Sequence, residues 1–338
     1  MKLRRLLQDF VVEELNEFHI LESGEFKLYS LQKQGLETFY IIHYLSRTND
    51  IPRNAIGIAG LKDKHAITKQ YFTIPREYEI KTLKENNYEI IFFGYLDAEL
   101  HRGDLLGNRF QITARDITTG QLEGIYKRAS DITEIGVPNY YDSQRFGSVI
   151  KGVFIRKLVE ENRYEEALKA YLTLYKRSEH KESKKDKREI FSHWDDLSTV
   201  KVTNNTLKAV INEYLATKDW KKAYAKIPSH LRELYKHAYE SYQWNENVKE
   251  ILSTNVTSVY SITSAAGKLL FYKKLSKEEK QQLPDTIGER KLLIFPKNFV
   301  ISRPLIDELH ANRYKITVSF ELPKGNYATI VTKRLFNN

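Results

Sequence analysis

Two kinds of hydrophobic pattern follow one another along the chain. In residues 36–45 the apolar side chains recur near every third or fourth position, which predicts a helix. Residues 71–75, 88–96 and 109–117 are rich in β-branched and aromatic residues between turn signals, which predicts strands. The first third of the chain therefore predicts strands and helices in alternation.

The C-terminal residues return to the strand pattern. Apolar and polar side chains alternate in residues 314–322, and a Pro-Lys-Gly-Asn turn follows at 323–326. We expect a second strand from Tyr327, so that the two strands form a hairpin. A terminal hairpin is marginal by itself in water, and these strands are therefore expected to pair with the N-terminal sheet.

The middle of the chain has a helical and strongly charged pattern from about residue 153 to about residue 226. A long helix is predicted after it, with Ser229 as the N-cap and apolar positions at a 3.6-residue period as far as Ile251. The charged run at 176–189 is interpreted as a solvated loop or helix face rather than an RNA-binding arm. The helical middle is therefore predicted to be inserted into a domain formed by the two β-rich ends.

Composition narrows the chemistry. The 338 residues carry a net charge of +10 and include no cysteine, which excludes disulfides, a thiol nucleophile, thiolate zinc sites and iron–sulfur clusters. The sequence has no apolar stretch of membrane-spanning length, so a soluble, cytoplasmic protein is expected. The histidines do not fall at metal-ligand spacing, and no metal is predicted. A basic excess favours an acidic partner, and nucleic acid is the commonest one.

One candidate for catalysis lies in a short glycine-bearing segment, residues 57–72. Asp63 is flanked there by Lys62 and Lys64, whose positive charges favour its ionised form. A carboxylate held ionised beside lysines can act as a nucleophile or general base on a nucleic acid. Taken alone, the same three residues are more typical of a charged surface turn.

Five separated motifs place this segment in a larger pattern. Together they resemble the TruD family of tRNA pseudouridine synthases, in the family's order, with Tyr141 at a position where the family usually has Phe. The motifs are residues 8–14 (QDFVVEE), 59–66 (AGLKDKHA), 102–110 (RGDLLGNRF), 136–147 (GVPNYYDSQRFG) and 320–329 (FELPKGNYAT).

The resemblance implies an α+β fold. It predicts a pseudouridine synthase catalytic domain with a mixed or antiparallel sheet, made of residues 1–151 and 303–338. Residues 152–302 are then the inserted TRUD domain, mainly helical with some α/β character, which clamps tRNA against the catalytic sheet.

The resemblance also implies an activity, the isomerisation of a uridine to pseudouridine in tRNA at position 13 of the D-arm. Asp63 is the implied nucleophile, and three routes stay open: attack on C1′, attack on C6, or removal of a C2′ proton on the way to a glycal. No cofactor is implied. The implied partner is tRNA, with no protein or membrane partner, and a monomer is expected.

Further site residues follow from the same motifs. Phe110 is expected to stack on the flipped uracil and Asn108 to contact the base or the Asp63 loop, although both also fit as ordinary strand and turn residues. Arg4 is the candidate basic partner of Asp63, since a buried carboxylate is costly without one.

The remaining candidates concern RNA binding. Lys62 and Lys64 are expected to contact phosphates, and Arg145 either contacts a phosphate or buttresses the site. His65 is interpreted as a hydrogen-bonding residue of its own loop rather than as an acid or base.

Two other functions compete with this hypothesis. One is a non-catalytic RNA-binding or tRNA-folding protein on the same scaffold. The other is a metal-dependent nuclease that uses Asp63, Asp116 and Asp142, which share no motif.

Overall fold

The computed structural model describes residues 1–264 and 267–336, which divide into two compact units. The first unit is Met1–Asn139 with Lys273–Asn338, and the second is Tyr140–Tyr272. A segment in the middle of the chain thus folds as a body of its own. The domain boundaries expected after residues 151 and 302 stay a prediction.

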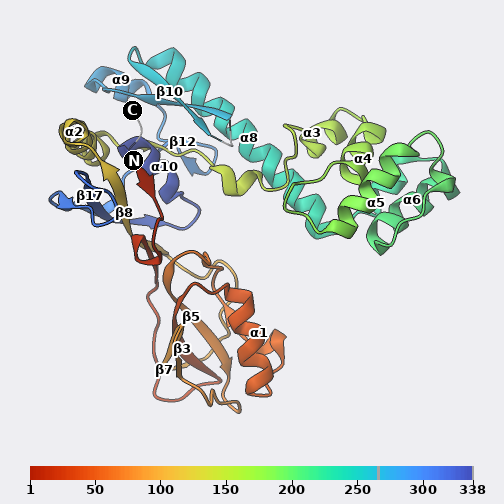
Figure 1. Cartoon of the computed structure of the whole chain (residues 1–338), viewed down its shortest axis with the longest axis horizontal. Helices are drawn as coiled ribbons and strands as arrows, with labels where there is room; N and C mark the ends of the chain where they lie inside the picture. The colour runs from red at the N-terminus through yellow and green to blue at the C-terminus, as the bar shows by residue number, and fades with distance from the viewer. Residues whose placement is uncertain (265–266, 337–338) are drawn as a thin grey trace. The chain divides into compact units, whose positions relative to one another are not determined.

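A mixed sheet forms the centre of the first unit (Figure 1). Its strands are β1 (Lys2–Leu3), β2 (Phe10–Leu15), β3 (Phe26–Gln34), β4 (Gly57–Ile58), β5 (Ile67–Pro75), β6 (Lys84–Glu85), β7 (Tyr88–Leu96), β8 (Gly107–Ile117), β15 (Lys297–Ile301), β16 (Leu305–Ile306) and β17 (Tyr314–Pro323). The main order is β15-β17-β8-β2-β5-β3-β7-β6, while β1 pairs with β8, β4 with β5 and β16 with β17.

The strands pair in both directions. β2 runs parallel to β5, whereas β17 with β8 and β3 with β7 are antiparallel pairs. The predicted strands at 88–96 and 109–117 are present as β7 and β8, and the C-terminal β17 pairs with β8 as expected. The predicted α+β class with a mixed sheet is confirmed.

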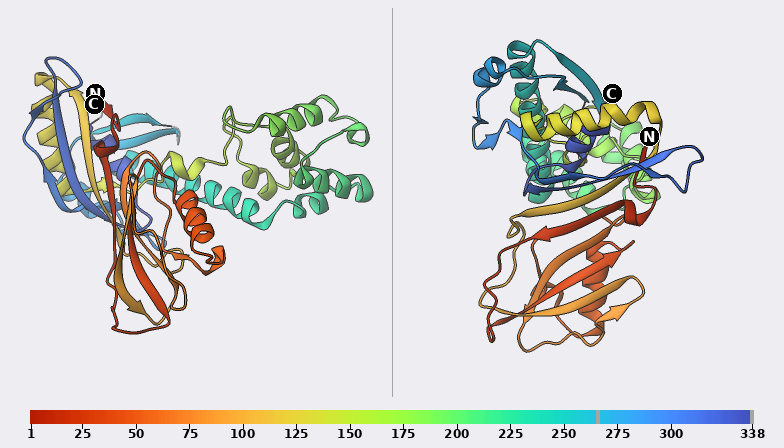
Figure 2. Two further views of the ribbon diagram at one scale, coloured as in Figure 1. Left: turned by 60° about the horizontal axis from the view of Figure 1, so that its bottom comes forward. Right: turned by 90° about the vertical axis from the view of Figure 1, so that its left-hand side faces the viewer.

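Helix α1 (Thr38–Thr48) covers one face of the sheet beside β3, β5 and β7, as both Figure 1 and Figure 2 show. Its apolar residues Ile41, Ile42 and Leu45 lie at helical spacing and pack into one buried cluster with strand residues such as Phe72. The helix predicted at 36–45 is therefore present. This packing places the start of α1 beside the segment that carries Asp63.

The first unit also contains other helices and short strand pairings. They are the 3₁₀ helices η1 (Leu7–Asp9) and η2 (Arg53–Ala55), α2 (Thr119–Ile135), α9 (Lys277–Gln282), α10 (Ala328–Phe336), and the strands β9 (Val137–Pro138), β12 (Thr286–Ile287), β13 (Arg290–Lys291) and β14 (Leu293–Ile294). β12 pairs with β13, and β9 pairs with β14.

The predicted C-terminal hairpin is wrong in its second half. The chain turns after β17 and forms helix α10 instead of a strand. Ile330 and Val331 are adjacent and both buried, which a strand cannot achieve against one layer because successive side chains point to opposite faces. α10 packs on α2 instead, where Arg128 Nε donates to the Leu335 carbonyl at 2.7 Å.

The second unit is mainly helical. Its core gathers buried side chains of α4, α6 and α7, including Leu168, Val210 and Ala223. Its elements are η3 (Ser143–Phe146), α3 (Ile155–Glu160), α4 (Tyr164–Thr173), α5 (Lys181–Ser192), η4 (Leu197–Thr199), α6 (Asn205–Thr217), α7 (Trp220–Ala225), α8 (Ser229–Asn255), β10 (Val259–Ser264) and β11 (Gly267–Tyr272).

The long predicted helix is present as α8, but its start differs from the prediction. Pro228 occupies the N-cap position and Ser229 is the first helical residue, without a side-chain cap hydrogen bond. The charged run at 176–189 enters α5, whose Asp186 and Ile190 are buried. Nowhere in the described residues is a helix both long and apolar enough to span a membrane.

Candidate active site

Asp63 lies in the loop between β4 and β5, and side chains from α1 and β5 hold the backbone of that loop. The Lys62 N–H donates to Thr38 Oγ1 at 3.0 Å, at the start of α1. On β5, Gln70 Nε2 donates to the Gly60 carbonyl at 3.3 Å. Both contacts hold the part of the loop directly before Asp63, so Asp63 projects from a defined backbone.

The Asp63 carboxylate faces the guanidinium of Arg4. Arg4 Nη1 lies 3.4 Å from Asp63 Oδ2, and the two side chains are 34% and 40% exposed. The same guanidinium stacks 3.7 Å above the centre of the Phe10 ring. The pair is therefore oriented while its carboxylate stays open to a substrate.

A buried ion network shapes the turn that carries Arg4. Arg4 has a left-handed backbone with φ of 55°, and the Asp9 carboxylate accepts the next two N–H groups, those of Arg5 and Leu6. Arg115 is 2% exposed and donates through Nε to both oxygens of Asp9 at 2.9 Å. Its hydrogen bonds to Asp9 raise the pKa of the Arg115 guanidinium, so Arg115 keeps its positive charge.

The position of Lys62 does not fit its predicted role as a phosphate contact, because its side chain is buried. Its side chain is 7% exposed, and its Nζ lies 2.6 Å from Glu14 Oε1 on β2. Glu14 is itself buried and accepts the Tyr71 N–H at 2.9 Å. The positive charge of Lys62 is used inside the protein, because a buried carboxylate needs a partner.

Phe110 and Asn108 lie on β8, two residues apart, so they share one face of the strand. Phe110 is 9% exposed and packs between Phe10 and Phe320, with ring centres 6.4 and 5.6 Å away. The Asn108 amide oxygen is buried and accepts no hydrogen bond from the described residues. Phe10 connects the Asp63–Arg4 pair with Phe110, because its ring contacts both the Arg4 guanidinium and the Phe110 ring.

The other predicted residues are placed differently. Lys64 and His65 are exposed beside Asp63. Arg145 belongs to the second unit, where its Nε donates to Ser241 Oγ at 3.1 Å and its guanidinium lies 5.5 Å from the Tyr141 ring. Of the two lysines that flank Asp63, Lys64 is thus the exposed one.

Four residues of the loop's support were not among the predicted site residues: Lys33, Thr38, Gln70 and Glu14. Lys33 is 1% exposed, and burial lowers its pKa to about 8. A usable signal was the alternation of β3, since Lys33 falls on the same face as the buried Leu31. A lysine at an inward strand position predicts a buried ammonium with specific partners.

The nuclease hypothesis finds no support in the geometry. No three His, Asp or Glu residues converge as a metal site anywhere in the described part of the chain. Asp116 instead pairs with Lys2 at 3.4 Å and Arg313 at 3.2 Å, and Asp142 accepts the Ser143 N–H at the start of η3.

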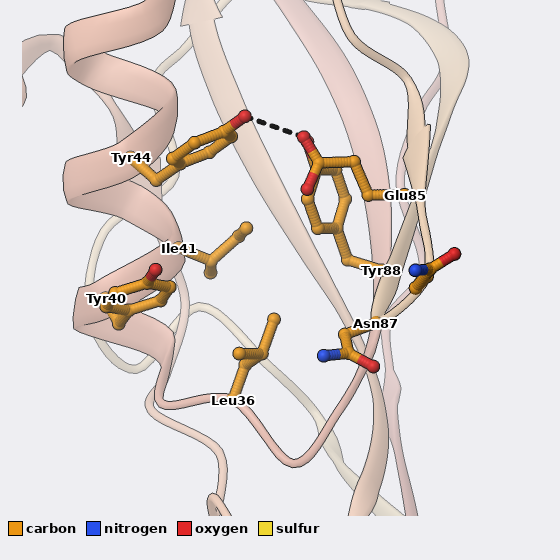
Figure 3. Close-up of a pocket in the computed structure, with 8 residues that line it drawn as sticks. Leu36, Tyr40, Ile41, Tyr44, Glu85, Asn87 and Tyr88 are labelled. Carbon is orange, nitrogen blue, oxygen red and sulfur yellow. Dashed lines mark hydrogen bonds between the residues drawn. The ribbon is translucent and has the colours of Figure 1, made fainter.

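A hollow of about 350 Å³ lies elsewhere in the first unit, between α1 and the β6–β7 turn (Figure 3). Tyr44 donates its hydroxyl hydrogen to Glu85 at 2.6 Å on the wall of this hollow. Asp63 and Arg4 are not among its lining residues. The candidate catalytic groups therefore lie outside this hollow, around the Asp63 loop.

Comparison with known proteins gives one consistent family. A family model described as tRNA pseudouridine synthase D (TruD) matches residues 1–286. The probable tRNA pseudouridine synthase D 1 of Methanococcus maripaludis is 34% identical, with 100% of both chains covered. The probable tRNA pseudouridine synthase D 2 of Methanocaldococcus jannaschii is 36% identical over 99% of this chain and 92% of the relative.

A solved structure agrees in fold. It is a crystal structure from Methanosarcina mazei described as tRNA pseudouridine synthase D (TruD), with a TM-score of 0.75. It is 22% identical and covers 100% of this chain and 93% of its own.

Proposed function

The chain belongs to the tRNA pseudouridine synthase D (TruD) family, and from this premise we propose that it isomerises the uridine at position 13 of the tRNA D-arm, with Asp63 as its nucleophile. Membership identifies the activity as that of a tRNA pseudouridine synthase, an isomerase. The position and the residue roles are the content of the proposal.

The reaction moves one bond from nitrogen to carbon. The C1′–N1 bond of the uridine breaks, the base turns, and a C1′–C5 bond forms. C5 gives up its proton and N1 gains one, so the atoms balance without an oxidant or reductant. The protein must supply a group that reacts at the sugar or base, and a surface that holds the detached uracil.

The observation that carries the proposal is the Asp63 carboxylate, 40% exposed and 3.4 Å from the Arg4 guanidinium. A carboxylate in this position can attack C1′ or C6, or remove a C2′ proton. Arg4 also offers its positive charge to negative charge that develops on the base or sugar.

Phe110 and Asn108 are proposed to hold the base. Stacking on an aromatic ring stabilises a bound base by about 1–3 kcal/mol, which offsets part of the cost of flipping the uridine out. The Asn108 amide oxygen has no hydrogen-bond donor among the described residues, and the uracil N3–H is a donor that fits it. Lys64 and Arg145 are proposed to contact phosphates.

The test uses an unmodified tRNA transcript tritiated at uracil C5, with chelator present. Tritium release reports loss of the C5 proton, and mapping of the product gives the modified position. Wild type is compared with Asp63→Asn, which removes the nucleophile at almost constant shape. Asp50→Asn is the matched control, since Asp50 is an 89% exposed aspartate that pairs with Lys81 at 3.8 Å.

We expect release from one D-arm uridine by wild type and Asp50→Asn, and none from Asp63→Asn. Full activity of Asp63→Asn would remove Asp63 from its proposed role. Tight tRNA binding without release by wild type would favour the non-catalytic RNA-binding hypothesis instead.

A further inference from the structure

Lys33 is a buried ammonium whose hydrogen bonds all go to backbone carbonyls. Its side chain projects from the end of β3 and is 1% exposed. Its Nζ donates to the Leu36 carbonyl at 2.7 Å, the Asp63 carbonyl at 3.2 Å and the Lys62 carbonyl at 3.4 Å. The three hydrogens of the ammonium thus have three acceptors, two of them in the loop that carries the candidate nucleophile.

This arrangement is costly for stability alone. Among the described residues, no carboxylate lies within ion-pair distance of the Lys33 ammonium, so backbone carbonyls are its direct partners, and the Asp63 and Glu37 carboxylates act on its charge only from further away. Burial of a charged group without a counter-ion is unfavourable by several kcal/mol, and a well-packed apolar side chain commonly serves stability as well or better. A reason for the lysine is therefore to be sought in what its hydrogen bonds hold in place.

Thr38, Gln70 and Lys33 each hold a different backbone group of the Asp63 loop. Thr38 binds the N–H of Lys62, and Gln70 binds the carbonyl of Gly60. Lys33 binds the carbonyl of Asp63 itself, at the residue whose side chain must point at the substrate. Rotation of that peptide would swing the carboxylate away from Arg4.

We propose that Lys33 is a positioning residue, which holds the Lys62–Asp63 backbone so that the Asp63 carboxylate faces Arg4 and the target uridine. The inference rests on the proposed function, in which Asp63 is the reacting group. Lys33 acts through the loop and does not touch the substrate. A shift of about 1 Å in a reacting group costs on the order of 100-fold in rate, which sets the size of the expected effect.

The charge of Lys33 links this role to pH. Burial lowers the pKa of Lys33 to about 8, while Asp63 acts to raise it, Lys62 to lower it, and Glu37 to raise it. Tyr88, a further titratable residue, lies opposite Lys33 on β7. Above about pH 8 the neutral amine keeps two N–H donors for three carbonyls, so the hold on Asp63 weakens as pH rises.

The experiment measures single-turnover tritium release at saturating tRNA, from about pH 6.5 to about pH 9. Lys33→Met removes the ammonium but keeps an unbranched side chain. Lys27→Met is the matched control, because Lys27 lies six residues earlier on the same face of β3 and donates to the Tyr78 carbonyl at 2.9 Å. Circular dichroism melts and tRNA affinity are measured for each protein.

Near neutral pH we expect Lys33→Met to react about 30- to 100-fold more slowly than wild type, with tRNA affinity within about threefold. Lys27→Met should react within about twofold of wild type. The wild-type rate should fall through about pH 8, and this alkaline loss should be absent from the residual activity of Lys33→Met.

Equal rates for Lys33→Met and wild type, or a slowing that Lys27→Met shares, would overturn the inference. Should Lys33→Met fail to fold, Lys33→Arg replaces it, because a guanidinium stays charged at every pH tested. A folded Lys33→Arg with the same alkaline loss as wild type, or a wild-type rate that is flat to about pH 9, would also overturn it. An inactive wild type would instead contradict the proposed function.

Discussion

Two neighbouring residues of one loop, Lys62 and Asp63, belong to ion pairs of opposite kinds. The Lys62–Glu14 pair is short, at 2.6 Å, and its side chains are 7% and 0% exposed. The Asp63–Arg4 pair is longer, at 3.4 Å, and its side chains are 40% and 34% exposed. Two consecutive residues thus carry a buried charge, on Lys62, and an exposed charge, on Asp63.

The difference separates stability from chemistry. Solvent screens the exposed pair, which therefore adds little to the free energy of unfolding but leaves a carboxylate accessible to a substrate. The buried pair cannot lose one partner without leaving an uncompensated charge, so it ties the loop to β2. Changes in the Lys62–Glu14 pair should therefore destabilise the protein, and changes in the Asp63–Arg4 pair should slow the reaction with little effect on stability.

The largest expected effect on folding is that of Lys62→Met. It leaves Glu14 buried without its cation, so we expect a loss of about 3–5 kcal/mol in the free energy of unfolding, measured by urea denaturation. Lys64→Met, one exposed lysine further on, is the control and should lie within about 0.5 kcal/mol of wild type. Equal stability of the two variants would break the comparison between buried and exposed charge.

Phe110→Leu tests the aromatic cluster of Phe10, Phe110 and Phe320, on which the Arg4 side chain stacks through Phe10. Leucine keeps most of the apolar volume between Phe10 and Phe320 but removes the aromatic face. We expect turnover to fall about 10- to 100-fold, in line with the loss of base stacking, and stability to fall by less than about 1.5 kcal/mol. A loss of stability without a loss of turnover would make Phe110 an ordinary core residue.

Acid should weaken the buried network that supports Arg4, because Arg115 Nη1 also pairs with Asp307 at 3.0 Å and with Glu308 at 3.1 Å. Although burial acts to raise it, hydrogen bonds from the Asp116 and Leu309 N–H groups hold the pKa of Asp307 well below its usual range. The Lys315 side chain lowers the pKa of the neighbouring Glu308 to about 2. Carboxyls with lowered pKa values contribute stability above their unfolded values, and this contribution is lost as pH falls from about 4.5 to about 2.

Melting temperatures across that range check this prediction. Asp307→Asn should show a shallower loss in acid than wild type, because one of the lowered carboxyls is gone. An unchanged acid profile would mean that other carboxyls dominate the linkage.

The smallest expected effect on stability is that of Arg4→Gln. We expect a change of less than about 1 kcal/mol in the free energy of unfolding, because the pair with Asp63 is exposed, together with a clear loss of turnover. The same tritium assay and urea melts check both parts. A large loss of stability would place Arg4 with the buried pair and remove the contrast drawn between the two pairs.

Much of the fold was predictable from local pattern. Residues 88–96 are a strand, and residues 38–45 a helix, because hydrophobic period and residue type act over a few neighbours. The family's motifs likewise pointed to Asp63, Arg4, Asn108 and Phe110, whose roles in the reaction stay predictions.

The sequence-based predictions failed where contacts between segments far apart in the chain determine the structure. After β17, α10 is a helix because its adjacent apolar residues pack on α2, some 200 positions away in the chain. Lys62 looked like a phosphate contact because its local surroundings are polar, yet Glu14 on β2 takes its charge into the interior.

By itself, the sequence determined the alternation of helices and strands, the family, and the loop that carries the Asp63 carboxylate. Only the tertiary structure decided which charges of that loop are buried, and it brought Lys33, Glu14 and Arg4 around Lys62 and Asp63. The physical reason is that the solvation and partners of a charge depend on which segments meet in space. Neighbours along the chain do not determine that meeting.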